Sequence, residues 1–351
     1  MPPLRSPGRR LPLWKKLVFA CVPLCALFLL GEIVARALRE PFWFGSYRAL
    51  RVDQVQRGYP AVRDSELGYV TRPGADGVGN RWGTRLRIDA DGFRSNGAPV
   101  PAGGKPIVAV GDSFTFGDQV SDDETWPAYL EQILQRPVKN GGVFGYSLAQ
   151  AVLRAERILG TVPAEWLVVS LIPDDINRCE LAKRYAPLPY FEVVDGSLQL
   201  RNVPVQDTSD PEEMRSRAFK DFLGRSALID AVLANVVNRW WIVDQKEVRA
   251  HPPGKGAEIA LLLVDRIADF CEKRSCRVMF LLQGERGTEA ATAVLARARS
   301  RGLAALDLIA RVEEEERADP SVRARYFRGH MTAAGNRWVA EQVAEVIAAV
   351  R

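Results

Sequence analysis

The chain has 351 residues, of which 47% are hydrophobic and 26% are charged, and its formal net charge is +5. This length and composition suit one large or two modest folded domains and exclude a wholly disordered chain. Five basic residues precede residue 17, and without them the chain holds 43 basic and 43 acidic residues. The positive excess therefore lies in a tail, and the composition excludes a strongly basic face for nucleic acid.

The first predicted element is an apolar helix over residues 17–36, which follows a basic cytoplasmic tail over residues 1–16. Its nineteen residues from Leu17 to Ala35 extend about 29 Å as a helix, which matches the hydrocarbon core of a bilayer. Because the positive residues precede the helix, we expect a single-pass membrane protein with a cytoplasmic N-terminus and an extracytoplasmic domain, periplasmic or at the cell surface. A cleaved signal peptide is the main alternative, since residues 35–37 read Ala-Arg-Ala, and a buried helix of a soluble protein is the third.

Cysteine and histidine are scarce in this chain. Two of the five cysteines lie in the predicted span, and of the other three, Cys271 and Cys276 are placed to pair if their compartment is oxidising. The chain has two histidines, and the spacing of its cysteines matches no metal-ligand pattern. We expect neither a metal nor a cofactor.

Residues 37–104 form a predicted lead-in segment packed on the main domain, with a hairpin or edge strands around residues 84–89. From residue 105 to 351 apolar runs alternate with helical segments. The expected strands cover residues 107–110, 138–140, 166–171, 277–282 and 304–308, and the expected helices cover residues 125–134, 148–159, 257–273, 288–301 and 332–350. This alternation predicts βαβ units and a parallel sheet.

The alternation of predicted strands and helices is interrupted at about residues 183–256. We interpret this segment as an insertion over the sheet edge. It contains a hairpin-like segment at residues 192–200 and the pair Trp240-Trp241. The two tryptophans either form a platform for a sugar or acyl group, or pack the insertion onto the domain or the membrane interface.

The most informative segment is Ile107–Gly117, where a buried strand runs into Gly-Asp-Ser. Ser113 would lie at the carboxyl end of a parallel strand, where α/β sheets form their reaction crevice. It is either a nucleophile or the cap of the next helix. Three further polar segments follow predicted strands or precede the last helix, at residues 140–146, 172–175 and 329–335.

With these four segments, the chain resembles the SGNH (GDSL) hydrolase superfamily over roughly residues 105–350, as a membrane-anchored member of bacterial type. The resemblance implies a three-layer α/β/α sandwich with a central parallel, flavodoxin-like sheet. It also implies Ser113 as nucleophile and His330 as general base. The oxyanion hole would use the backbone amides of Ser113 and Gly145 and a side chain from the third segment.

Two positions depart from the family pattern. Asp174 stands where the family has an asparagine, and an ionised carboxylate cannot donate a hydrogen bond to an oxyanion. Phe327 and Arg328 occupy the positions of the acid that orients the histidine. The candidates to replace that acid are Asp174, Asp175 and Asp307.

The predicted function is that of an ester hydrolase or O-acyltransferase, with acetyl as one candidate group, acting on an extracytoplasmic glycan or lipid. The alternative is a catalytically silent glycan-binding or scaffold subunit of a cell-envelope assembly. The expected partners are the acyl-ester substrate and the membrane, and no nucleic acid.

Overall fold

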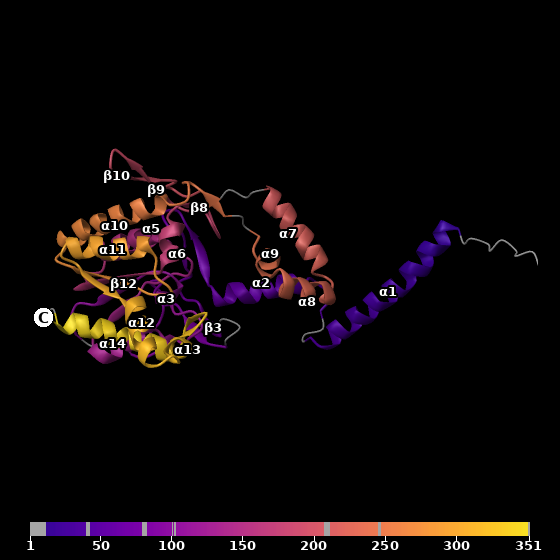
Figure 1. Cartoon of the computed structure of the whole chain (residues 1–351), viewed down its shortest axis with the longest axis horizontal. Helices are drawn as coiled ribbons and strands as arrows, with labels where there is room; N and C mark the ends of the chain where they lie inside the picture. The colour runs from indigo at the N-terminus through magenta and orange to yellow at the C-terminus, as the bar shows by residue number, and fades with distance from the viewer. Residues whose placement is uncertain are drawn as a thin grey trace, which may run out of the picture. The chain divides into compact units, whose positions relative to one another are not determined.

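The computed structural model describes residues 12–39, 43–78, 83–99, 101, 103–206, 211–244 and 247–349 (Figure 1). The chain forms two compact units, one built from residues 1–53 and 210–244 and the other from residues 54–209 and 245–351. Most of the predicted basic tail lies outside the described residues.

The second unit is built on a five-stranded parallel sheet, as predicted. Its strands are β5 (Ile107–Val110), β6 (Val138–Asn140), β7 (Trp166–Leu171), β12 (Arg277–Leu282) and β13 (Ala304–Asp307). Their order across the sheet is β13-β12-β7-β5-β6, and each neighbouring pair is parallel. This is the flavodoxin-like order, in which the direction of chain progression reverses between β5 and β7.

Helices cover both faces of this sheet, which confirms the three-layer sandwich (Figure 1). One face carries α5 (Leu148–Leu159), α10 (Lys255–Glu272) and α11 (Glu289–Ser300), and the other carries α4 (Trp126–Leu134), α12 (Leu308–Ala318) and α14 (Ala333–Ala349). Strand side chains alternate between the faces: Val108 and Val110 pack in the first core, and Ile107 and Ala109 in the second. Since all four are fully buried, β5 reads as a continuous apolar run.

Shorter elements frame the sheet. They are β1 (Ala61–Asp64), β2 (Gly68–Thr71), β3 (Asp76–Val78), β4 (Arg85–Arg87), α3 (Ser113–Phe116), a 3₁₀ turn (Asp122–Glu124), α6 (Pro173–Arg178), β8 (Leu181–Lys183), β9 (Tyr190–Val194), β10 (Ser197–Arg201), β11 (Val248–Arg249), α13 (Val322–Tyr326), β14 (Phe327–Arg328) and β15 (His330–Met331). The pair β9–β10 is the hairpin expected near residues 192–200.

The first unit is helical. It contains α1 (Leu13–Ala37), the start of α2 (Tyr47–Gly58), α7 (Pro211–Leu223), α8 (Ala227–Val236) and α9 (Asn238–Ile242). Its centre is Arg48, which is 1% exposed, donates to the Trp241 carbonyl at 2.6 Å and pairs with Asp221 and Asp244. Trp241 is fully buried and so takes the packing role, whereas Trp240 is half exposed.

Helix α1 is long and apolar enough to cross a membrane, with a mean hydropathy of 2.5 over an 18-residue window. None of that window is buried. A signal sequence near an N-terminus has the same length and composition, so these two properties alone do not separate an anchor from a cleaved leader.

Candidate active site

Ser113 begins a four-residue helix at the carboxyl end of β5. The carboxylate of Asp112 caps this helix by accepting a hydrogen bond from the Phe114 amide at 2.9 Å, and Gly117 ends it in the left-handed conformation, with φ of 88°. The short helix α3 therefore fixes Ser113 beside the point where the strand order reverses.

His330 is held beside Ser113 by a tight hairpin. Strands β14 and β15 pair across Gly329, whose φ of 86° suits a glycine, and the flanking Phe327 and Met331 are buried in the core. The Nε2 atom of His330 lies 3.0 Å from the Ser113 hydroxyl. The structure thus brings together two residues that are separated by 217 positions in the sequence.

Two residues that the sequence analysis did not select also contact His330. One carboxylate oxygen of Asp118 lies 3.5 Å from His330 Nε2 and accepts a hydrogen bond from the Tyr59 hydroxyl at 2.8 Å. The side-chain amide of Gln119 lies 3.2 Å from the other ring nitrogen, Nδ1. His330 therefore has a carboxylate near the nitrogen that faces Ser113 and an amide on its far side.

Asp118 is a buried carboxyl, with a side chain that is 5% exposed. Burial raises its pKa above the usual value, although the nearby His330, the Tyr59 hydroxyl and Arg94 pull in the opposite direction. Its second carboxylate oxygen is buried and has no hydrogen-bond partner among the described residues. An incompletely satisfied buried carboxylate costs stability, and such groups concentrate at functional sites.

The Gln119 amide decides which nitrogen of a neutral His330 carries the proton. In the orientation found, the amide nitrogen faces Nδ1 and donates to it, which leaves the proton on Nε2. A half turn of the amide brings its oxygen to the same place, and Nδ1 then donates. Only the second tautomer leaves Nε2 free to accept a proton from Ser113.

A second group of charges lies on the other side of Ser113. Arg178 donates to Asp175 at 2.5 Å and to Asp112 at 3.4 Å, and Asp112 in turn lies 3.3 Å from the Ser113 hydroxyl. Burial raises the pKa of Asp175 well above its usual value, and the charge of Asp112 adds to this effect. The Ser113 hydroxyl thus lies within reach of the Asp112 carboxylate, which accepts from it, and of His330 Nε2, which accepts only in the second tautomer.

The predicted oxyanion amides are available as donors. Neither the Ser113 nor the Gly145 amide donates a hydrogen bond within the described part of the chain. Gly145 has φ of 71°, and a Cβ there would lie 2.6 Å from a ring carbon of Tyr185, so a side chain at this position would strain the backbone and displace Tyr185. At Gly142, a Cβ would lie 2.3 Å from the Phe116 amide nitrogen, so the second segment packs directly on α3.

Among the described residues, no hydrogen bond or ion pair joins His330 to any of the three acids predicted to orient it. Asp174 has a side chain that is 71% exposed and lies 3.9 Å from Arg178. Asp175 binds Arg178, and Asp307 caps α12 by accepting from the Ala310 amide at 3.0 Å. The carboxylate that lies beside His330 is instead that of Asp118.

One sequence feature, Gly117, points to Asp118 and Gln119, although neither residue was among the predicted site residues. Gly117 ends α3 after one turn, and the next amide, of Asp118, donates back to the Ser113 carbonyl at 3.1 Å. A glycine that ends a helix one turn after a serine at a strand end turns the following residues back toward that serine. Residues one and two places beyond that glycine are therefore candidates for the site.

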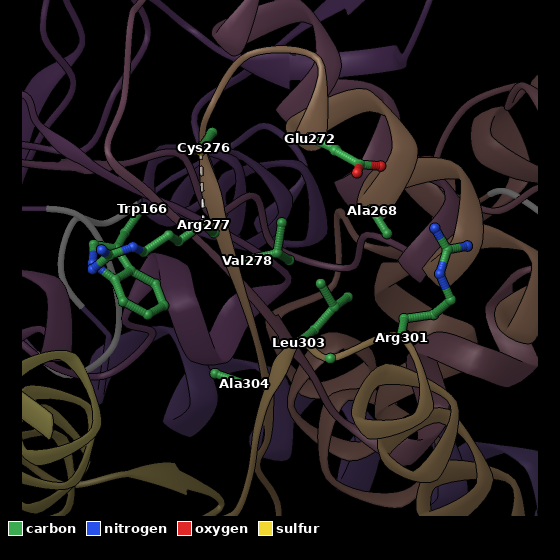
Figure 2. A pocket seen from close by; sticks show the side chains of 10 residues that line it. Trp166, Ala268, Glu272, Cys276, Arg277, Val278, Arg301, Leu303 and Ala304 are labelled. Atoms are coloured by element: carbon green, nitrogen blue, oxygen red, sulfur yellow. Dashed lines mark hydrogen bonds between the residues drawn. The ribbon is translucent and has the colours of Figure 1, made fainter. Parts of the chain in front are cut away.

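A hollow of about 710 Å³ lies elsewhere, where β7, β12 and β13 begin (Figure 2). Figure 2 shows the Arg277 side chain beside the Trp166 ring, 5.6 Å from its centroid, with Arg301 on the far wall. This hollow is at the amino ends of the strands, and Ser113 follows the carboxyl end of β5, so the two belong to opposite edges of the sheet.

Comparisons with known proteins find likeness in solved structures. A protein described as lipolytic, of the G-D-S-L family, from Desulfitobacterium hafniense DCB-2 has 14% identity and a TM-score of 0.38, and it covers 69% of this chain and 99% of its own. TesA has 12% identity and a TM-score of 0.37, covering 69% of this chain and 98% of its own.

LAE5, an alpha/beta hydrolase enzyme from the metagenome of Lake Arreo, Spain, has 12% identity and a TM-score of 0.39, covering 69% of this chain and 95% of its own. No family model matches the chain, and no curated protein matches it. At this level of similarity, a function has to be argued from the geometry around Ser113 and His330.

Proposed function

We propose that the protein is a serine ester hydrolase or O-acyltransferase in which Ser113 is the nucleophile and His330 the general base. The observation that carries this proposal is the 3.0 Å distance between the Ser113 hydroxyl and His330 Nε2. A serine hydroxyl is a weak nucleophile until a neighbouring base takes its proton, and an imidazole within hydrogen-bond distance is such a base.

In the first half of the reaction, Ser113 Oγ attacks the ester carbonyl carbon and its proton passes to His330 Nε2. The negative oxygen of the tetrahedral intermediate accepts hydrogen bonds from the Ser113 and Gly145 amides. The intermediate then collapses, the bond to the leaving alcohol breaks, and that alcohol takes the proton from His330. An acyl group remains on Ser113.

In the second half, water attacks the acyl group in hydrolysis, or an acceptor hydroxyl attacks it in transfer. His330 takes the proton of the attacking group and returns it to Ser113. While His330 is protonated, the carboxylate of Asp118 at 3.5 Å stabilises its positive charge. The Gln119 side-chain oxygen, turned toward Nδ1, keeps the ring in the required tautomer.

We propose further that α1 is an uncleaved anchor and that the second unit lies outside the cytoplasm, as the basic residues before α1 favour. Glu32 near the end of α1 accepts hydrogen bonds from Ser226 Oγ at 2.6 Å and from the Ala227 and Leu228 amides at 3.0 Å. Cleavage after residue 37 would remove this cap of α8. In this location an acyl ester of a glycan or a lipid is the proposed substrate.

The test uses the full-length chain in detergent with 4-nitrophenyl acetate. The Ser113→Ala protein is expected to lose turnover by at least about 10³-fold, because no other hydroxyl replaces the nucleophile. The matched control is Ser300→Ala, since Ser300 is exposed at the end of α11 and lies outside the site. Equal turnover by the Ser113→Ala and wild-type proteins would refute the proposal.

Covalent labelling separates an unreactive site from an unsuitable substrate. An alkyl phosphonate is expected to add its mass to the peptide that contains Ser113, and not to do so in the His330→Ala protein. Absence of labelling in the wild-type protein would favour the second candidate, a silent binding subunit. The observation that favours this candidate is the amide, in place of a carboxylate, at His330 Nδ1.

A further inference from the structure

The first unit ties the end of α1 to the beginning of α8. Glu32 accepts from the Ser226 hydroxyl and from the first two amides of α8, and the guanidinium of Arg36 donates to the Arg225 carbonyl at 2.7 Å. The first amides of a helix have no partner within the helix, so a carboxylate there fixes the helix end. Helix α8 therefore starts at the level of residue 32 of α1.

This level is where a bilayer crossed by α1 would end. The 15 residues from Leu17 to Gly31 carry no charged side chain and extend about 23 Å as a helix, and the long side chains of Lys15 and Lys16 before them can reach the headgroups on that side. Exposed apolar side chains line this segment, as in Phe19 at 69% and Leu27 at 65%. Glu32 and Arg36 are the first charged residues to follow, so the start of α8 falls at the boundary between hydrocarbon and headgroups.

One apolar row of α8 begins against α1 and continues beyond it. Leu228 contacts α1 at Gly31, where a Cβ would lie 2.9 Å from a Leu228 methyl group. Val232 and Val236 follow at intervals of four residues, which places them in the same row of the helix. They are 50% and 74% exposed, so the row that packs on α1 becomes an uncovered apolar surface.

Helices α7 and α9 of the same unit also carry large exposed apolar side chains. On α7, Met214, Phe219 and Phe222 are 61%, 58% and 65% exposed. Trp240 of α9 is half exposed, and Lys220 of α7 lies 4.9 Å from its ring centroid, which brings the two helices together. Clustered exposed side chains of this size mark an interaction site, and tryptophan is enriched at membrane interfaces.

We propose that Met214, Phe219, Phe222, Val232, Val236 and Trp240, here called the apolar rim, lie in the headgroup region of the bilayer that α1 crosses. The occupant is lipid because the row on α8 is continuous with the contact on α1 and starts at the level where the hydrocarbon ends. The inference rests on α1 as an anchor and does not depend on the chemistry of Ser113.

The test measures the depth of single labels in the full-length chain in phosphatidylcholine vesicles. The exposed thiols of Cys21 and Cys25 are first removed as Cys21→Ala and Cys25→Ala, and the other three cysteines are buried. A nitroxide is attached at Phe222→Cys or Val236→Cys. Leu27→Cys in α1 provides the bilayer reference, and Leu200→Cys in β10, 36% exposed in the second unit, provides the water reference.

Collision with dissolved oxygen is compared with collision with a polar nickel chelate. The ratio of oxygen to nickel collision rates at residues 222 and 236 is expected to exceed that at residue 200 and to approach that at residue 27. A ratio equal to that at residue 200 would refute the proposed location of the apolar rim in the headgroup region. Spin–spin broadening at residues 222 and 236 would also overturn it, because a second copy would then cover the surface.

The reference label distinguishes the two proposals. If the label at residue 27 is itself open to the nickel chelate, the anchor fails and the apolar rim fails with it. If residue 27 is protected and residues 222 and 236 are open, the anchor stands and the rim alone is refuted. Ester turnover of each labelled protein should equal that of the wild type, since these side chains point into solvent in the structure.

Discussion

Asp118 combines a cost in stability with a proposed role in catalysis. Burial raises its pKa in the folded protein above its usual value of about 3.9. A group whose pKa is raised by folding stabilises the folded protein fully at a pH below its usual pKa. This contribution to the free energy of unfolding is lost as the pH rises through the raised pKa. Burial therefore disfavours the charged form of Asp118, and the stability of the wild-type protein falls as the pH rises through the raised pKa.

We expect Asp118→Asn to melt at a higher temperature than the wild type at pH 7, and the difference to shrink as the pH falls toward 4. Ester turnover should fall in the same variant by about tenfold or more, because a charged partner of His330 is lost. Melting curves across pH, with exposed Asp123→Asn as control, check the first expectation. A variant that is less stable at every pH would contradict it.

Gln119 gives a prediction that separates positioning from packing. Gln119→Glu places an acceptor beside Nδ1 in either orientation, so turnover should be equal to or higher than that of the wild type. Gln119→Leu keeps the bulk and removes the acceptor, and kcat/KM should fall by about 10- to 100-fold. Equal losses in both variants would mean that Gln119 only fills space.

The sequence predicts Ser113 and His330 as candidate site residues because each lies in a recognisable segment at a strand end or before a helix. It does not identify Gln119, whose φ of 71° is unusual for a residue other than glycine and turns the side chain toward a histidine 211 positions away. The acids chosen from the sequence, such as Asp307, follow strands as expected and then cap helices. The local sequence alone does not distinguish a carboxylate that caps a helix from one that contacts the histidine.

At the scale of elements, the loop after α3 is held by one buried side chain. Arg94 is 2% exposed and donates to the carbonyls of Phe116, Gly117 and Val120 at 2.6 to 2.9 Å. Since this loop carries Asp118 and Gln119, a single guanidinium fixes both partners of His330 relative to α3.

Arg94→Leu should therefore lower stability and activity together. The substitution removes the buried guanidinium from three carbonyls and from Asp122. We expect this to lower the free energy of unfolding by about 3–5 kcal/mol. Arg337→Leu removes an arginine that is 66% exposed and should change the free energy of unfolding by about 0.5 kcal/mol or less. Urea unfolding of both proteins measures the difference, and similar values would contradict this account of the loop.

Elements with a strong apolar period are predicted within a residue or two. The strands at 107–110, 138–140, 166–171 and 277–282 match β5, β6, β7 and β12. Helices α7 to α9 are not predicted, because their apolar side chains do not form one buried face: Phe222 and Val236 are exposed and Trp241 is buried.

At the scale of the whole molecule, we expect the full-length chain to stay in the membrane pellet after an alkaline carbonate wash. Loss of residues 1–37 should release the chain and also destabilise the first unit, because Glu32 caps α8. Sedimentation and limited proteolysis near residues 211–244 measure the two effects. Release of the intact chain by carbonate would contradict the anchor.

The hydrogen bond between Glu32 and Ser226 joins residues 194 positions apart. The unit that contains α1 is thus interrupted in the sequence by much of the sheet domain, and its second half is synthesised long after α1. During translation Glu32 has no hydrogen-bond partner on α8 until residues 226–228 have been synthesised. If α1 is the proposed anchor, assembly of this unit at the membrane is a late event, completed when most of the polypeptide has already been synthesised.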